Sequence, residues 1–245
     1  MTEYFTTSEN RRIAYCKTAG TGPGVVFCGG YKSDMEGSKA LALEAWAKRT
    51  GRAFLRFDYS GHGQSEGAFE DGAIGDWYED ARDIILALTE GPQIVVGSSM
   101  GGWISLLLAR EHPEKLAALV TIAAAPDFTE DSFWAGFTPE QKRELEEVGH
   151  IDLPSDYDAP YRVTRRLVNE GRNRLVLRAP LPLPFPVRFL QGTADTSVSI
   201  DTATRLLAQA DGADMRLTLV KGADHSFSTP ECLAMIETAL AEVSG

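Results

Sequence analysis

Two kinds of hydrophobic pattern alternate along this chain. Short runs that are apolar throughout are typical of strands buried on both faces of a sheet, and apolar residues that recur every three or four positions are typical of helices that bury one side. Because parallel strands need crossover connections, this alternation predicts an α/β fold with a mostly parallel central sheet flanked by helices. Strands are predicted at residues 4–7, 12–17, 24–28, 53–57, 93–96, 116–123, 187–191 and 215–220. Helices are predicted at residues 38–50, 74–89, 101–111, 139–148, 159–170, 199–210 and from 229 onward.

The alternation of strands and helices stops after Pro126. The segment that follows is charged, carries two predicted helices and ends in the proline-rich sequence APLPLPFP. We therefore expect an α/β core made of residues 1–126 and 185–245. Residues 127–184 are expected to form a helical cap at the carboxyl end of a strand, where α/β sheets carry functional loops.

Composition narrows the classes of function. The 245 residues carry a formal net charge of -11, which argues against a protein that neutralises nucleic-acid phosphates. Cys16, Cys28 and Cys232 are scattered, without the spacing of a zinc site or a disulfide framework. The sequence shows neither a signal-peptide pattern at its start nor a run of about 18 apolar residues. We expect a cytoplasmic protein with no nucleic-acid partner and no membrane span, and the oligomeric state stays open.

The stretch Gly97-Ser98-Ser99-Met100-Gly101 fits the pattern G-x-S-x-G between a predicted strand and a predicted helix. In such a sharp turn the central serine holds its hydroxyl clear of the sheet, and the flanking glycines let strand and helix pass closely. The pattern therefore predicts a nucleophile at Ser99, with Ser98 at the variable position. An ordinary strand-to-helix turn that happens to contain serine is the alternative.

A serine nucleophile needs a base, and the chain has four histidines. His225 directly follows the last predicted strand, so its imidazole is expected over the carboxyl edge of the sheet. His62 lies in a glycine-rich turn and is expected to stabilise it. His112 ends a predicted helix, and His150 lies in the predicted cap. We predict His225 as the base, with an exposed loop residue as the alternative reading.

The base needs an orienting carboxylate, and Asp195 directly follows the preceding predicted strand. Asp224 is next to His225 in sequence but would point away from it along an extended backbone, and Asp201 belongs to a helix start. The chain order Ser99, Asp195, His225, each at the end of a different predicted strand, therefore predicts a Ser-His-Asp triad.

An acyl-transfer serine also needs hydrogen-bond donors for the tetrahedral oxyanion. The backbone N–H of Met100 is the first candidate, and the N–H of Tyr31, just after Gly29-Gly30, is the second. Phosphate-binding loops, dinucleotide fingerprints and metal-ligand helices are not present in the sequence. We therefore expect no cofactor and no metal.

These motifs resemble those of the α/β-hydrolase fold family, and the likeness covers nearly the whole chain. The stretches FCGGYKSDMEGSKALALE, LRFDYSGHGQSEG, GPQIVVGSSMGGW and ELEEVGHIDLPSDY are similar to a mitochondrial branch of palmitoyl-protein thioesterases and acyl-glucuronide esterases. The resemblance implies Ser99 as nucleophile, Asp195 as acid and His225 as base. It also implies a small-molecule or acylated-protein substrate. We expect no transit peptide and a partly different cap, which implies a bacterial-type or cytosolic relative.

Apolar residues near the predicted nucleophile are candidates to line an acyl pocket, with ordinary core packing as the alternative. They are Trp103, Phe133, Trp134, Phe137 and Leu153. The cap sequence YRVTRRLVNEGRNRLVLR also carries six arginines against one acid. Four of them are candidates to meet a carboxylate on the leaving group, with a solvated helix face as the alternative: Arg162, Arg165, Arg166 and Arg172.

The first hypothesis for function is a serine hydrolase that cleaves esters or thioesters through an acyl-enzyme. A general carboxylesterase, a peptidase or a carbon–carbon bond hydrolase could use the same triad. A non-catalytic ligand receptor on the same scaffold is a different class, and the complete triad with its oxyanion loop disfavours it.

Overall fold

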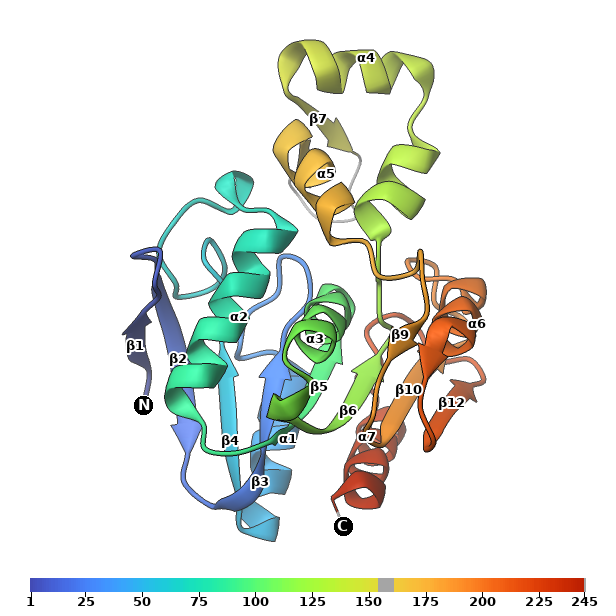
Figure 1. Ribbon diagram of the computed structural model, residues 1–245. Helices are drawn as coiled ribbons and strands as arrows, with labels where there is room; N and C mark the ends of the chain where they lie inside the picture. Colours follow the sequence, from blue (N-terminus) through green and yellow to red (C-terminus); the bar gives the residue numbers. More distant parts are fainter. Residues whose placement is uncertain (154–160, 245) are drawn as a thin grey trace.

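An eight-stranded sheet forms the centre of the protein, whose computed structural model describes residues 1–153 and 161–244 (Figure 1). The order across the sheet is β1-β2-β4-β3-β5-β6-β10-β12. β2 runs antiparallel to both of its neighbours, and the strands from β4 to β12 are parallel to one another, which confirms the predicted α/β fold. The strands are β1 Glu3–Thr6, β2 Arg12–Thr18, β3 Thr21–Cys28, β4 Arg52–Phe57, β5 Gln93–Ser98, β6 Leu116–Ile122, β10 Val187–Gly192 and β12 Met215–Val220.

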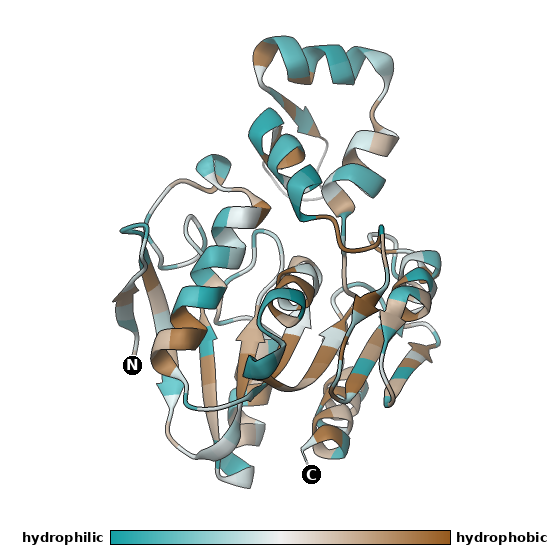
Figure 2. Ribbon diagram, in the orientation of Figure 1, coloured by the Kyte–Doolittle hydropathy of each residue, from teal (hydrophilic) through white to brown (hydrophobic). Residues whose placement is uncertain are grey.

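Five helices cover the two faces of the sheet. The apolar residues of α1 and α7 pack together on one face, and those of α2, α3 and α6 lie in the cluster on the other. Strand β5 between them is buried at every position, as expected for a strand covered on both sides. Figure 2 shows the resulting apolar sheet strands in brown. The helices are α1 Ser38–Thr50, α2 Ile74–Leu88, α3 Met100–Glu111, α6 Ile200–Gln209 and α7 Pro230–Val243. Every start lies within one residue of its prediction, and so does every end that was predicted.

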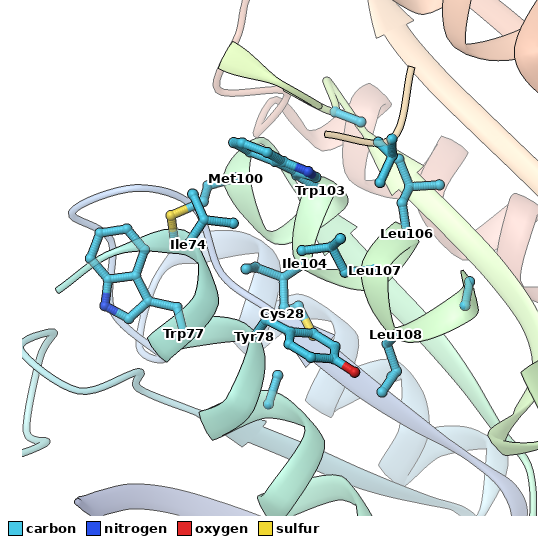
Figure 3. Close-up of a cluster of buried hydrophobic side chains, with 14 of the residues drawn as sticks. Cys28, Ile74, Trp77, Tyr78, Met100, Trp103, Ile104, Leu106, Leu107 and Leu108 are labelled. Carbon is cyan, nitrogen blue, oxygen red and sulfur yellow. The ribbon is translucent and has the colours of Figure 1, made fainter. Parts of the chain in front are cut away.

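Large side chains from α2 and α3 fill the space between these helices and the sheet (Figure 3). Trp77 of α2 and Trp103 of α3 are both completely buried. The indole N–H of Trp77 donates to the Ser60 carbonyl at 3.1 Å, and that of Trp103 donates to the Arg174 carbonyl at 3.0 Å. A buried indole is stable only where its N–H finds such a partner, so both tryptophans also fix loops outside the sheet.

The chain leaves the sheet after β6 and returns to it at β10. Figure 1 shows α4, β7 and α5 of this excursion as a lobe above the carboxyl ends of the parallel strands. We call residues 127–153 and 161–184 the cap segment. Its elements are the π-helical η3 Thr129–Trp134, α4 Pro139–Val148, β7 His150–Leu153, β8 Tyr161–Thr164, α5 Arg165–Gly171, η4 Arg172–Arg174 and β9 Leu181–Pro182, and β9 pairs with β11 Ala210–Asp211. Short 3-10 turns elsewhere are η1 Phe69–Asp71 and η2 Pro113–Lys115.

The prediction of one helix over residues 159–170 is wrong for residues 161–164 and is confirmed for residues 165–170, which lie in α5. Residues 159 and 160 lie outside the described residues. Tyr161–Thr164 forms strand β8, which pairs antiparallel with β7. An aromatic and two β-branched residues in four positions favour a strand over a helix. Thr164 then caps α5, because its hydroxyl accepts the Leu167 N–H at 3.1 Å.

Hydrogen bonds to carboxylates join the cap segment to α2. The Arg166 guanidinium contacts the Asp76 carboxylate at 2.9 Å, and the Glu170 carboxylate accepts the Gly75 N–H at 2.7 Å. Asp76 and Gly75 lie in the first turn of α2, where a carboxylate is favoured by the helix dipole. These contacts hold α5 against the N-terminus of α2.

Candidate active site

The turn that carries Ser99 has a strained backbone. Ser99 lies between β5 and α3 with φ 54° and ψ −117°, a region that costs a non-glycine residue of order 1–3 kcal/mol. Its N–H donates to the Ile122 carbonyl at 2.9 Å, and its carbonyl accepts the Ala125 N–H at 3.0 Å. The turn is therefore tied to the end of β6, which holds the hydroxyl at the carboxyl edge of the sheet.

The two glycines of the motif allow backbones to approach closely. A Cβ on Gly101 would lie 2.1 Å from the Cys28 carbonyl oxygen, and one on Gly97 would lie 2.4 Å from the Gly101 carbonyl oxygen. No side chain fits at such distances. The start of α3 therefore packs directly against the end of β3, which brings the loop after β3 next to Ser99.

Three side chains from separate strand ends form one chain of hydrogen bonds. The Nε2 atom of His225 lies 3.0 Å from the Ser99 hydroxyl oxygen. The Nδ1 atom of His225 lies 2.8 Å from a carboxylate oxygen of Asp195. The fold thus brings together the three residues that the sequence predicted as a triad, although Ser99 and His225 are 126 residues apart in the chain.

The environment of Asp195 keeps its carboxylate charged. Its side chain is fully buried, and burial alone would raise its pKa, but hydrogen bonds from His225 and from the Val198 and Ser197 N–H groups outweigh burial and lower the pKa of Asp195 below its usual value. The Gln191 side-chain amide adds a fourth donor at 3.0 Å. Gln191 was not predicted, and its only signal in the sequence is its place at the end of the predicted strand 187–191, four residues before Asp195.

The remaining acids and histidines have other partners. The Asp224 carboxylate accepts hydrogen bonds from the Phe227 N–H at 3.0 Å and from the Ser226 hydroxyl. It therefore stabilises the turn that follows it and forms no hydrogen bond with the imidazole of His225 in the described structure. His112 lies 3.6 Å from Glu114, and His150 begins β7 in the cap segment. Within the described residues, only His225 of the four histidines contacts Ser99.

The loop after β3 passes close to Ser99. A Cβ on Gly30 would lie 3.4 Å from the Ser99 Cβ, so the backbone of Gly30 and Tyr31 borders the hydroxyl. The next N–H, that of Lys32, donates to Nε2 of the buried His62 at 3.3 Å. Met100 is the first residue of α3, where backbone N–H groups point out of the helix. Tyr31 and Met100 therefore lie next to Ser99, and the role of their N–H groups as oxyanion donors stays a prediction.

An apolar cavity of about 340 Å³ lies between Ser99 and the cap segment. Phe133 and Leu153, both predicted for an acyl pocket, line it. The sequence did not identify the other apolar side chains of its wall. The lining residues are Tyr31, Ser99, Ala125, Phe128, Ser132, Phe133, Leu153, Tyr161, Ser197, Val198 and His225.

Three aromatic residues predicted for the pocket do not line this cavity in the described structure. Trp103 is fully buried between α3 and η4 (Figure 3). Phe137 is 7% exposed and stacks on Phe133. Trp134 lies against the guanidinium of Arg172, 4.5 Å from its ring centre. Trp103 packs against Phe128 and Phe137 against Phe133, so these two residues contact side chains that line the cavity without lining it themselves.

The four arginines proposed for a substrate carboxylate already contact groups of this chain. Arg162 pairs with Asp152 at 2.8 Å, and Arg172 pairs with Glu130 at 2.7 Å. Arg166 pairs with Asp76, and Arg165 donates to the Glu146 carbonyl. In this structure these arginines join the elements of the cap segment to one another and to α2.

Residues 1–153 and 161–244 contain neither a cluster of metal ligands nor a helix that could span a membrane. Among these residues, no group of three or more His, Cys, Asp or Glu side chains could hold a metal ion. Within the same part of the chain, no helix has the length and apolar character to cross a bilayer.

Comparison with known proteins agrees with the arrangement of sheet, turn and loops. The family model described as the alpha/beta hydrolase fold matches residues 25–165. The chain belongs to the α/β-hydrolase fold family. Within this family, it is 39% identical over 215 residues to the bovine and human proteins named palmitoyl-protein thioesterase ABHD10, mitochondrial, which covers 87% of this chain and 70% of each relative. The relatives are named mitochondrial, which does not agree with the cytoplasmic location expected here, so that location stays a prediction.

Two solved structures of α/β-hydrolases match almost the entire chain. A putative hydrolase from Agrobacterium vitis S4 is 36% identical with a TM-score of 0.95, over 100% of this chain and 99% of that chain. The mouse alpha/beta hydrolase domain-containing protein 10 is 33% identical with a TM-score of 0.92, over 99% of this chain and 98% of that chain. The cap segment is therefore part of the shared architecture, since both matches span it.

Proposed function

We propose that this protein is a serine hydrolase that cleaves carboxylic esters or thioesters through an acyl-enzyme. The observation that carries the proposal is the hydrogen-bond chain from Ser99 through His225 to Asp195 beneath an apolar cavity. The names of the mammalian relatives, palmitoyl-protein thioesterases, support a thioester as the first substrate class to test. The division into a core, residues 1–126 and 185–245, and a cap, residues 127–184, is part of the same proposal.

In the first half of the reaction, Nε2 of His225 accepts the proton of the Ser99 hydroxyl while the serine oxygen attacks the acyl carbonyl carbon. Asp195 keeps the proton on Nδ1 of His225 and stabilises the imidazolium. The carbonyl oxygen becomes an oxyanion, which the N–H groups of Tyr31 and Met100 bind. The bond to the leaving sulfur or oxygen then breaks, and the imidazolium protonates the leaving group.

In the second half, a water molecule takes the place of the leaving group. His225 accepts a proton from this water, whose oxygen attacks the acyl-serine carbonyl. The ester bond to Ser99 breaks, the serine oxygen regains its proton from His225, and the carboxylic acid leaves. The reaction consumes one water per bond cleaved and needs no redox partner.

The apolar cavity supports an acyl group with a hydrocarbon chain. Phe128, Phe133 and Val198 present only carbon atoms at the ends of their side chains. A hydrocarbon chain bound against them would stabilise the complex by about 25 cal/mol for each Å² of apolar surface removed from water. A strongly polar acyl group would lose hydration there without replacement. We therefore propose an aliphatic or aromatic acyl chain on this side of Ser99.

Turnover by matched variants tests this function. Wild-type protein is expected to hydrolyse p-nitrophenyl butanoate and a butanoyl thioester, and Ser99→Ala is expected to lose both activities by at least about 10³-fold. Ser98→Ala removes the neighbouring hydroxyl and serves as the matched control. A receptor without catalysis would bind a fatty acid in the apolar cavity yet turn over neither substrate, and that result would reject the proposal.

A further inference from the structure

A second cavity, of about 180 Å³, meets the apolar one at Ser99. Tyr31, Ser99 and His225 line both cavities, so these residues form the boundary between them. The second cavity lies between the loop after β3, the first turn of α1 and the residue after His225. A substrate whose carbonyl carbon sits at Ser99 would therefore place its acyl chain in one cavity and its leaving group in the other.

The walls of the second cavity carry several polar and charged side chains. Ser33, Asp34 and Ser38 contribute hydrogen-bonding groups, and Lys39 contributes the only cationic side chain among its described lining residues. Lys39 is half-buried and donates to the Ser226 carbonyl. None of the carboxylates in residues 1–153 and 161–244 forms an ion pair with it.

The position of Lys39 carries an energetic cost in the free protein. Burial lowers the pKa of Lys39, because it disfavours the ammonium form. Lys39 also lies in the first turn of α1, where the helix dipole favours negative rather than positive charge. A half-buried cation that has no ion-pair partner among the described residues and lines the same cavity as Ser99 is typical of a ligand site, since a bound anion would offset both costs.

Two acids near Lys39 are engaged within their own turns. Asp34 lines the cavity and accepts the Glu36 N–H at 2.8 Å. Asp224 raises the pKa of Lys39 through its charge, but its carboxylate accepts hydrogen bonds from Ser226 and Phe227. A ligand anion would meet the ammonium directly and these carboxylates only at longer range.

We propose that this second cavity is the leaving-group subsite, and that Lys39 makes it selective for leaving groups that carry a carboxylate. This inference rests on the proposed serine hydrolase activity and adds a specificity-determining residue to it. The carboxylate would accept hydrogen bonds from the N–H groups of Lys39 that do not face Ser226.

The test uses two esters with the same acyl chain and leaving groups of nearly equal shape. 4-(Butanoyloxy)benzoate releases an anionic phenol, and 4-carbamoylphenyl butanoate releases its neutral counterpart. The measured quantity is the ratio of kcat/KM for the anionic ester to that for the neutral ester. Lys39→Met is expected to lower this ratio about tenfold, the effect of losing one charged hydrogen bond.

Two further variants separate charge in the cavity from charge elsewhere. Asp34→Asn keeps the oxygen that accepts the Glu36 N–H and is expected to raise the ratio about two- to threefold. Lys48→Met removes a cation that lies on the same helix and pairs with Glu44 away from the cavity, and the ratio is expected to stay unchanged.

Each outcome decides the proposal. A ratio that stays within twofold of wild type in Lys39→Met overturns the subsite, and this includes an equal loss on both esters. If Lys39→Met does not fold, the direction of the change in Asp34→Asn decides alone. Wild-type protein that hydrolyses neither ester would contradict the serine hydrolase activity itself, and with it the subsite.

Discussion

The buried imidazole of His62 makes the stability of the fold depend on pH. His62 is 3% exposed and lies edge-on to the rings of Phe69 and Trp77, at 5.0 and 5.1 Å between ring centres. Because Nε2 accepts the Lys32 N–H, the proton must sit on Nδ1, which faces the Ser60 carbonyl at 3.2 Å. Burial lowers the pKa of His62 to about 4.

The unfolded chain binds a proton at this histidine with a pKa of about 6.5, whereas the folded chain does so only near 4. The stabilisation that the neutral ring gives is therefore complete above pH 6.5 and is lost as the pH falls through this interval. The loss at pH 5 relative to pH 8 works out at about 2 kcal/mol from this one group.

Urea unfolding followed by tryptophan fluorescence at pH 8 and pH 5 measures this loss. His62→Gln retains a donor and an acceptor but cannot titrate. Wild type is expected to lose about 2 kcal/mol more than His62→Gln between the two pH values. Other groups also titrate, such as Asp58 and Asp80, whose pKa values burial raises. Their contribution to the loss of stability is the same in both proteins and cancels in the comparison. Equal losses in both proteins would refute the reasoning.

Three further predictions concern the site and its supports. Asp195→Asn is expected to lower kcat on p-nitrophenyl butanoate by about 10³- to 10⁴-fold with little change in KM, and an unchanged kcat would contradict the role of the carboxylate. Gly101→Ala is expected to cost about 3 kcal/mol in urea unfolding, since its Cβ would lie 2.1 Å from the Cys28 oxygen, whereas Gly136→Ala, with nothing within 4 Å, should stay within about 0.5 kcal/mol of wild type. Val198→Trp fills the apolar cavity and is expected to lower kcat/KM at least about tenfold for p-nitrophenyl octanoate relative to the acetate; equal effects on both esters would place the acyl chain elsewhere.

The relation between sequence and site follows from the geometry of parallel sheets. Residues directly after parallel strands meet at one edge, so Ser99, Asp195 and His225 could be paired before any contact was known. Gln191 and the close approach of Gly30 could not be predicted in this way. The contact of Gln191 with Asp195 depends on how the loop after β10 folds back on its own strand, and the close approach of Gly30 depends on how the loop after β3 packs against the turn at Ser99.

The cap segment was harder to predict, because its charges and aromatic residues have partners far away in sequence. Arg166 pairs with Asp76, 90 residues earlier in the chain, and so holds α5 against α2. Trp103 looked like a pocket residue because it follows the nucleophile closely, but at the fourth position of α3 it turns into the core. Val198 lines the cavity. It follows Asp195 by only three residues, and this closeness in sequence could have identified it.

Covalent labelling tests the central claim most directly. Wild-type protein treated with a fluorophosphonate, digested and analysed by mass spectrometry is expected to carry the phosphonyl group on Ser99, in the peptide that contains both Ser98 and Ser99, with fragment ions that separate the two. Denatured protein should not react, because the activated serine depends on His225 and on the folded turn. A label on Ser98 or on another residue, or no label on folded protein that hydrolyses esters, would contradict the account.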